Sequence, residues 1–593
     1  MGALLIAVTA FASPLASPAQ AADARHDDLI CNAMHTLSVP KDESKQAAQI
    51  MAGTVDMGSY GTMQLAADPD WAPQATLDLS GNRYQNSLHW ALPLLREGTR
   101  GGVEADLMTA RFVALLHDWV TDHPTDQRGS WIDHQQYGGF RLGTWVCASR
   151  LLVDPVERTW VADQMKIDLA VQLKRFTTNG ANNTMLNSQL AAYAAAWEVG
   201  TAAQRTKALS NVNALRKMLL NADGSDIEGA PGYGSYLSQI FLRTERVLTA
   251  HNAVKSAAAV RTSINRQGKF LAQATRPDRY IESIGDGALR KIASGIFATD
   301  STATWARTSG AQGTLPTKKY GRWEGGYVFG RSGWVKGRDE KSSYYSLRTS
   351  TKAPATAHRH LDTTAVTFFS NGVSWIGDPG PYRYDTSALR RFITKREAHS
   401  ALIAAASMTT TAPGVLLPAT SSKAADKTCV RDLAYEKTAG IGLTRCVYYL
   451  RTIDALVIQD VVTSTKSVAN VTQQWVLSPQ VGSVQEQPEG GYLLTGTTAS
   501  GKSRTARMLT SGTASVAAAG PVLGQFGTIY GEQHPGTVMS LPITISVGQI
   551  QETLTLVAAG DRPLGFERTT AADGRPSLKV TAGSARQSFV LAQ

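Results

Sequence analysis

The spacing of the apolar residues changes once along this 593-residue chain, and that change limits the possible folds more than any other feature. In the first half, apolar side chains recur three and four residues apart, for example Phe112, Leu115, Leu116 and Trp119. Such a repeat places one apolar stripe on a helix. Several stripes follow one another without intervening strands, which predicts antiparallel helix pairs that stack as a bundle or close into a ring.

The pattern becomes strand-like after residues 305–325, where Gly310, Gly313 and Pro316 indicate a linker or surface loop. Short β-branched and aromatic runs then follow, bounded by Gly, Asp, Asn and Ser, which is typical of an antiparallel β-sandwich. We therefore expect an α+β multidomain protein, with a helical domain over residues 23–310 and a β-sandwich over residues 311–593. A separate terminal β subdomain could begin at about residue 500.

Residues 1–22 are predicted to be a signal peptide. Leu4 to Phe11 form an apolar stretch that is too short to span a bilayer. The segment that follows ends in Ala19-Gln20-Ala21, which fits an A-x-A cleavage site. No later stretch has about 18 uncharged apolar residues, so we expect a secreted protein without a membrane anchor.

The chain has four cysteines, Cys31, Cys147, Cys429 and Cys446. An even number in an exported protein indicates disulfides, for which three pairings are possible. Cys429 and Cys446 flank a predicted hairpin, so we pair them with each other and Cys31 with Cys147. No C-x-x-C pair occurs, which argues against a cysteine-based metal site.

The formal net charge is +11, and a positive excess raises the local concentration of anions. The basic residues are spread thinly and form no run, so we expect no nucleic-acid partner. An anionic polysaccharide fits an exported protein better, while a basic surface without a binding role is the alternative. The oligomeric state is left open.

Two segments of the helical half carry polar residues suited to a binding site. Asn182 and Asn183 lie where a helix is predicted to begin; they could cap that helix, or an amide could hydrogen-bond a substrate carboxylate. The second segment, residues 223–236, contains Glu228, Tyr233 and Tyr236 together with several glycines and Pro231. This composition predicts a loop, where ligand-facing groups commonly lie. Tyrosines that simply pack in a turn are the alternative.

The third segment, residues 358–399, gathers three of the eleven histidines with several carboxylates. They include His358, His360, Asp362, Asp378 and His399. On a regular strand, His358 and His360 would point to the same face, followed by Asp362. Imidazole and carboxylate are good ligands for a zinc-like ion, and imidazole also exchanges protons near neutral pH. The pattern predicts a metal site, an acid/base site, or both.

In this order, the three segments resemble those of the heparinase II/III-like polysaccharide lyases, over roughly residues 80–405. The matching pattern is an Asn segment, a Glu-Gly…Pro-Gly-Tyr loop, H-x-H-x-D, Asp-Pro-Gly-x-Tyr-x-Tyr and Arg-x-Ala-His. The hyaluronate/chondroitin lyases are a second relative, although they lack the histidine cluster. The resemblance implies an incomplete (α/α) toroid followed by an antiparallel β-sandwich.

The resemblance also implies β-elimination at a uronic acid. Asn182 or Asn183 would neutralise the substrate carboxylate, Tyr233 or Tyr236 would be the acid and could also be the base, and His358 would be the base or a partner of the substrate. Many relatives have His after the Asn pair, whereas this chain has Thr184, which places more weight on tyrosine and His358.

The remaining implied roles concern substrate binding and a metal. Arg383, Arg390, Arg396 and Glu228 are the expected substrate-binding residues. A tyrosine with an ordinary pKa of about 10 is a poor base at pH 7, so the arginines would also have to lower that pKa. The matching ligands of a structural zinc ion are His360, Asp378 and His399.

Two rival functions remain. A glycoside hydrolase usually needs two carboxylates beside the scissile bond, and Asp223, Asp226 and Glu228 could supply them. A non-catalytic polysaccharide-binding protein could use Trp131, Trp145 and Trp197 as sugar platforms. Only elimination leaves a conjugated double bond that absorbs ultraviolet light, so absorbance separates a lyase from a hydrolase, and a binding protein would leave the polymer unshortened.

Overall fold

The computed structural model describes residues 28–34, 42–58, 61–74, 77, 79–123, 135–177, 181–337, 341–349, 358–408, 414–528 and 531–592. The predicted signal peptide lies outside these residues. The chain forms two compact units. The first comprises Met1–Thr178, Asn183–Ala214 and Arg243–Ala257, and the second comprises Asn179–Asn182, Leu215–Leu242 and Ala258–Gln593.

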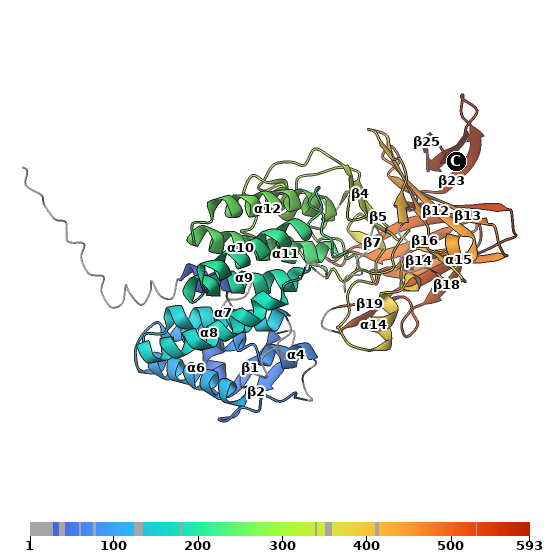
Figure 1. Cartoon of the computed structure of the whole chain (residues 1–593). Coiled ribbons are helices and arrows are strands. Elements are labelled where there is room, and N and C mark those ends of the chain that lie inside the picture. The colour runs from blue at the N-terminus through green and yellow to red at the C-terminus, as the bar shows by residue number, and fades with distance from the viewer. Residues whose placement is uncertain are drawn as a thin grey trace, which may run out of the picture. The chain divides into compact units, whose positions relative to one another are not determined.

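The first half is helical, as predicted (Figure 1, blue to green). Its helices are α2 (Leu29–Met34), α3 (Glu43–Met51), α4 (Leu79–Gln85), η2 (His89–Ala91), α5 (Leu92–Gly98), α6 (Val103–Asp122), α7 (Gln135–Leu151), α8 (Pro155–Arg175), α9 (Asn183–Glu198), α10 (Ala202–Met218), α11 (Pro231–Ala250), α12 (Val254–Ala274) and α13 (Thr302–Thr308). A small sheet pairs β1 (Thr54–Asp56) with β2 (Thr62–Gln64). None of the helices in the described part of the chain combines the length and the apolar character needed to cross a membrane.

The helices form where the sequence supplies stripes and caps. In α6, the predicted stripe Phe112, Leu115, Leu116 and Trp119 is fully buried. At the start of α8, the Asp154 side chain accepts a hydrogen bond from the Val156 amide, and a proline occupies the first turn. Within the first unit, α7 contacts both α8 and α9, so the buried stripes face neighbouring helices.

Strands replace helices after α13, and two antiparallel nine-stranded sheets follow. One has the order β10-β11-β12-β13-β22-β17-β16-β15 with β9 on β11, and the other has the order β18-β21-β14-β7-β6-β5-β4-β3 with β8 on β14. The first sheet contains β9 (Gly414–Leu416), β10 (Thr420–Ser421), β11 (Ala425–Asp432), β12 (Ile441–Leu450), β13 (Ala455–Ser464), β15 (Val481–Glu486), β16 (Tyr492–Thr497), β17 (Ser503–Thr510) and β22 (Ile550–Ala559). The second contains β3 (Tyr320–Trp323), β4 (Tyr327–Arg331), β5 (Tyr344–Arg348), β6 (Val366–Ser370), β7 (Val373–Ile376), β8 (Leu402–Ala404), β14 (Ala469–Leu477), β18 (Ser515–Ala518) and β21 (Thr537–Ile545).

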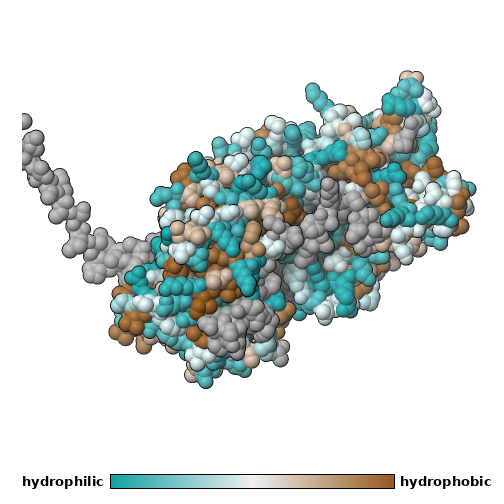
Figure 2. All heavy atoms as spheres, viewed as in Figure 1, coloured by the Kyte–Doolittle hydropathy of each residue, from teal (hydrophilic) through white to brown (hydrophobic). Residues whose placement is uncertain are grey.

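The two large sheets share one hydrophobic core, so the predicted sandwich is confirmed. Tyr345 and Trp375 of the second sheet and Leu456 and Val557 of the first belong to the same buried cluster. On the face drawn in Figure 2, polar residues separate the hydrophobic patches. Two further buried clusters, one around Val457 and one around Val462, take other apolar side chains of the strands.

Shorter elements complete the second half. They are α14 (Ala388–Ile393), η5 (Arg396–Ala398), α15 (Glu436–Ala439), β19 (Gln525–Gly527), β20 (Gln533–Pro535), β23 (Leu564–Thr570), β24 (Pro576–Ala582) and β25 (Ala585–Val590). After residue 500, β17, β18, β21 and β22 still pair within the large sheets, while β19–β20 and β23–β25 form small sheets of their own. Leu578 and Val580 of β24 belong to the same buried cluster as Val457 of β13, so the β23–β25 sheet packs on the first large sheet.

Both predicted disulfides are confirmed. Cys429 and Cys446 face each other in register in the β11–β12 hairpin and are bonded. Cys31 of α2 is bonded to Cys147 of α7, within the first unit.

Candidate active site

Two tyrosines and a histidine from three distant segments meet in the second unit. Tyr233 lies in the first turn of α11, Tyr384 follows β7, and His358 precedes β6. The Tyr233 and Tyr384 hydroxyls are hydrogen-bonded, and the Tyr384 hydroxyl lies 3.0 Å from His358 Nδ1. The Tyr233 ring stacks on the His358 ring, with centroids 3.6 Å apart and planes 15° apart. Tyr236 lies edge-on to Tyr233, with centroids 6.5 Å apart.

The buried carboxylate of Asp286 contacts the His358 ring of this group. Its side chain is fully buried; Oδ2 lies 3.3 Å from His358 Nδ1, and Oδ1 lies 3.0 Å from His360 Nε2. Arg390 donates to both carboxylate oxygens, the second bond at 2.9 Å. Burial alone would raise the pKa of Asp286, but hydrogen bonds from His358, His360 and Arg390 outweigh it and hold the pKa well below its ordinary value. Asp286 is therefore ionised at neutral pH.

The surroundings of Tyr233 favour its protonated form. Burial raises the pKa of Tyr233 well above its ordinary value, the charges of Asp286 and Glu228 act in the same direction, and the hydrogen bond to Tyr384 and the charge of Arg290 only partly oppose them. The lowered pKa that a tyrosine base would need is therefore not found for Tyr233. A phenol of this kind is a proton donor at neutral pH.

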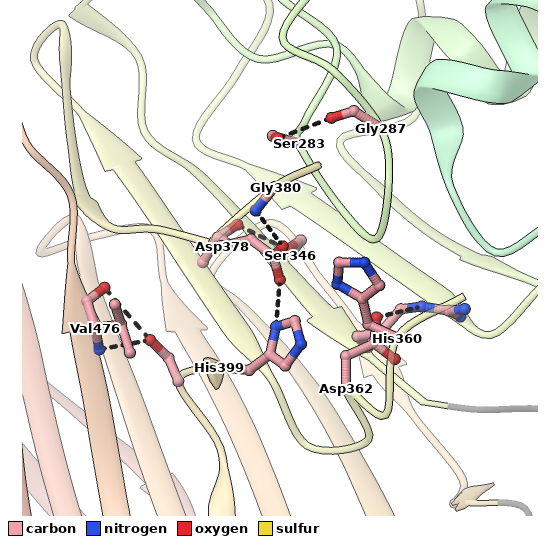
Figure 3. A network of polar contacts seen from close by, with 12 residues as sticks. Ser283, Gly287, Ser346, His360, Asp362, Asp378, Gly380, His399 and Val476 are labelled. Atoms are coloured by element: carbon pink, nitrogen blue, oxygen red, sulfur yellow. Dashed lines mark hydrogen bonds and ion pairs between the residues drawn. The ribbon is translucent and has the colours of Figure 1, made fainter. Parts of the chain in front are cut away.

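His360, Asp378 and His399 form a buried trio, as predicted for a metal site. One donor atom from each lies within 4.8 Å of the others, and Figure 3 shows the three side chains gathered around a common space. His399 Nδ1 lies 2.9 Å from Asp378 Oδ2. His360 Nδ1 and His399 Nε2 are buried and have no hydrogen-bond partner among the described residues. Two unpartnered imidazole nitrogens beside a carboxylate fit a divalent metal ion.

The histidines do not lie on the regular strand that was expected. Residues 358–360 precede β6 and adopt no strand. Both rings nevertheless reach Asp286, because His358 presents Nδ1 and His360 presents Nε2. Asp362 is buried and pairs with Arg348 at 3.2 Å, so it belongs to a neighbouring ion pair.

The acidic loop between α10 and α11 uses its carboxylates to hold its own backbone. Asp226 is buried and accepts hydrogen bonds from the Gly229 and Ala230 amides at 2.9 and 3.2 Å. Asp223 accepts from Ser225 and from the Glu324 amide. Glu228 is 1% exposed, which argues against the predicted contact with substrate. The pair of accessible carboxylates that a hydrolase needs is therefore not formed by these three residues.

Replacing Asp226 by asparagine is expected to remove a pH-dependent loss of stability. Burial, followed by the charge of Glu228, raises the pKa of Asp226 from 3.8 to about 6. The folded state then binds more protons than the unfolded state between these values, so the free energy of unfolding falls as pH rises through this window. The loss is complete above about pH 6 and amounts to roughly 3 kcal/mol.

Denaturant unfolding between pH 4 and pH 8 measures this effect. The wild type should lose stability as pH rises, whereas Asp226→Asn, which keeps an oxygen for the two amides, should show a flatter profile. Asp163→Asn is the control, since that carboxylate is 60% exposed. Parallel profiles for Asp226→Asn and the wild type would contradict the expected titration of Asp226.

The three predicted substrate-binding arginines have different environments. Arg383 is exposed. Arg390 is occupied with Asp286 and lies 4.8 Å from the Tyr384 ring. Arg396 is 3% exposed and pairs with Asp432 inside the β region, so its predicted role in substrate binding is not supported.

Asn182 and Asn183 lie at the start of α9, which begins at Asn183. Asn182 is half-buried and Asn183 is 3% exposed. A helix start is compatible with capping, and the greater exposure of Asn182 makes it the better candidate to meet a substrate.

Two of the three tryptophans considered as sugar platforms have different environments. Trp145 is fully buried and donates to Asp168 at 2.7 Å. Trp197 is 42% exposed and stacks on His251, with centroids 4.9 Å apart. Trp131 lies outside the described residues.

The sequence motifs singled out neither Asp286 nor the role of Tyr384. Asp286 lies in Gly285-Asp286-Gly287, outside every motif that was singled out. Its backbone amide donates to the His358 carbonyl at 3.0 Å. Tyr384 ends the Asp-Pro-Gly-x-Tyr-x-Tyr motif, which was the available signal.

Comparison with known proteins confirms the resemblance in the β region. Residues 324–539 match the family model described as Heparinase II/III-like, C-terminal. No curated protein matches the chain.

Solved structures extend the similarity over nearly the whole chain. Heparan sulfate lyase HepC from Pedobacter heparinus has a TM-score of 0.69 and 15% identity, over 97% of this chain and 94% of that one. A heparinase III structure has a TM-score of 0.76 and 13% identity, over 94% and 92%. A chondroitin AC lyase variant from Streptomyces coelicolor A3 has a TM-score of 0.51 and 11% identity, over 96% and 87%. These proteins share the predicted fold, a helical N-terminal region followed by an antiparallel β domain.

Proposed function

We propose that this protein is a polysaccharide lyase that cleaves a uronic-acid-containing polymer by β-elimination. Glycosaminoglycans are the best-supported substrate class, because they are the substrates named for the similar structures. The observation that carries the proposal is the hydrogen-bonded row of Tyr233, Tyr384 and His358. The row combines a protonated phenol with an imidazole, which can serve as the proton donor and the proton acceptor that elimination needs.

The reaction breaks the bond between C4 and O4 of the sugar without adding water. A base removes the C5 proton, and the electron pair of that C–H bond becomes the C4=C5 double bond. The C4–O4 bond breaks with its electrons on O4, which takes a proton from an acid. The products are a new chain end with a hydroxyl group and an unsaturated uronate.

We assign the base to His358 and the acid to Tyr233. Both hydrogen bonds of the His358 ring to the described residues involve Nδ1, so Nε2 is the nitrogen that takes the C5 proton. The raised pKa of Tyr233 keeps its phenol protonated for O4. Each group would contribute about 10²–10⁴-fold to the rate.

Asn182 or Asn183 would neutralise the uronate carboxylate, and alanine at the correct position should lower kcat more than it raises KM. Charge builds up next to the carboxylate in the transition state, so an amide donor there stabilises that state more than the bound substrate. Steady-state kinetics with each variant measure the two constants. A change in thermal stability with unchanged kinetics in both variants would show that these residues only cap α9.

A structural zinc ion at His360, Asp378 and His399 is part of the proposal. Neutral imidazole and carboxylate suit zinc, which would cross-link the three segments when bound. The unpartnered nitrogens of His360 and His399 support this assignment. We further propose that the protein is secreted, does not bind nucleic acid or membranes, and uses its net charge of +11 to attract an anionic polymer.

A screen of uronate polymers, read by ultraviolet absorbance, tests the function. Chondroitin sulfate, hyaluronan, heparan sulfate and alginate should be included, and at least one glycosaminoglycan should give rising absorbance. New reducing ends without absorbance would identify a hydrolase. Binding without shortening would identify a non-catalytic binding protein.

A further inference from the structure

We infer that Asp286 is a positioning residue that sets the tautomers of both His358 and His360. One buried carboxylate would thus prepare the imidazole proposed as base and the imidazole proposed as metal ligand. The inference deepens the proposed function and rests on it for the role of His358. The role at His360 can be tested without any activity.

The ionised carboxylate of Asp286 can only accept hydrogen bonds. Arg390 donates to both of its oxygens and supplies the compensating charge. Oδ2 faces His358 Nδ1 at 3.3 Å, and Oδ1 faces His360 Nε2 at 3.0 Å. Each of these ring nitrogens must therefore carry a hydrogen.

The consequence for His358 is that a neutral ring has its lone pair on Nε2. Nε2 is then the basic atom, while Nδ1–H is shared between Asp286 and the Tyr384 oxygen at 3.0 Å. Tyr384 accepts that hydrogen and donates its own to Tyr233. The Tyr233 hydrogen is left to point at a substrate oxygen, as an acid requires. The Asp286 carboxylate thereby fixes which atom donates each hydrogen bond between His358, Tyr384 and Tyr233.

The consequence for His360 is the opposite tautomer. With its hydrogen on Nε2, the lone pair lies on Nδ1, which is buried and has no hydrogen-bond partner among the described residues. A carboxylate that accepts from the far nitrogen of a ligating imidazole is a frequent support of metal sites. The same Asp286 would therefore orient a metal ligand and the base, 74 and 72 residues away along the chain.

The test is Asp286→Asn, with two independent measurements. The amide keeps the size of the side chain but cannot accept from all three neighbours. We expect kcat on the active polymer to fall by about 10²–10⁴-fold with little change in KM. We also expect zinc affinity, measured by competition with a chelating dye, to fall about 10–100-fold. Asp573→Asn, at a 49% exposed carboxylate in a hairpin, is the matched control.

The outcomes separate the inference from its rivals. Loss of both kcat and zinc affinity in a folded variant supports the shared role. Loss of only one, or of neither, overturns it, because Asp286 would then serve one histidine or none. If the wild type cleaves no polymer, the lyase proposal fails, while zinc affinity still decides the role at His360.

A measurement on the wild type covers the case in which the variant does not fold. Nitrogen NMR of ¹⁵N-histidine-labelled protein distinguishes the two tautomers, and His358→Gln and His360→Gln assign the signals. Hydrogen on Nδ1 of His358 and on Nε2 of His360 is expected. The reverse tautomer at either residue overturns the inference.

Discussion

Replacing Tyr233 by phenylalanine is expected to lower kcat on the active polymer by about 10²–10⁴-fold, because this phenol is the proposed proton donor to O4. The ring remains and can still stack on His358, so substrate binding should change little. Among the described residues, the hydroxyl hydrogen-bonds Tyr384, and loss of that bond costs about 1 kcal/mol. The melting temperature should therefore stay close to that of the wild type.

Tyr236→Phe is the matched control for this change. Tyr236 lies one turn further along α11 and edge-on to Tyr233, whereas Tyr233 itself stacks on His358 and hydrogen-bonds Tyr384. Its loss should affect kcat far less than the loss of Tyr233. An inactive Tyr236→Phe beside an active Tyr233→Phe would reverse the assignment, and full activity in both would remove tyrosine from the role of acid.

Treatment with a chelator is expected to lower both the melting temperature and the activity, because it would remove the metal ion proposed at the buried trio. An ion that binds only the folded arrangement of His360, Asp378 and His399 adds to stability, by about 4 kcal/mol at 1,000 times the dissociation constant. Treatment with a chelator should shift the melting temperature downward, and zinc should restore it. His399→Ala should abolish that zinc response, since its buried ring faces Asp378 and the trio.

His534→Ala is the control for this experiment, because His534 has a 53% exposed side chain near Glu532 and lies outside the trio. It should keep the full response to chelator and zinc. Elemental analysis of the purified protein gives the direct answer. Much less than one metal per chain, together with no effect of chelator, would contradict the metal site and leave these residues as a buried polar cluster.

The residue pattern predicted those features that depend on near neighbours in the chain. Apolar spacing located α6 and the strands, because periodicity reflects which face of an element is buried. The pairing of Cys429 with Cys446 followed from a hairpin, in which opposite positions are set by the turn between them. The metal trio was also predicted, although from its resemblance to a known family.

The tertiary structure alone decided which groups work together at the candidate site. Tyr233 and Tyr384 are 151 residues apart, and Asp286 and His358 are 72 apart. No local pattern predicts such contacts, because they depend on how α11 and the loops beside the sandwich pack. Packing likewise placed Arg396 against Asp432 and buried Glu228. The family resemblance had implied that both residues bind substrate. The sequence shows which residue types are available. The solvent access and the interaction partners of each side chain set its chemistry, and both arise only when distant segments pack together.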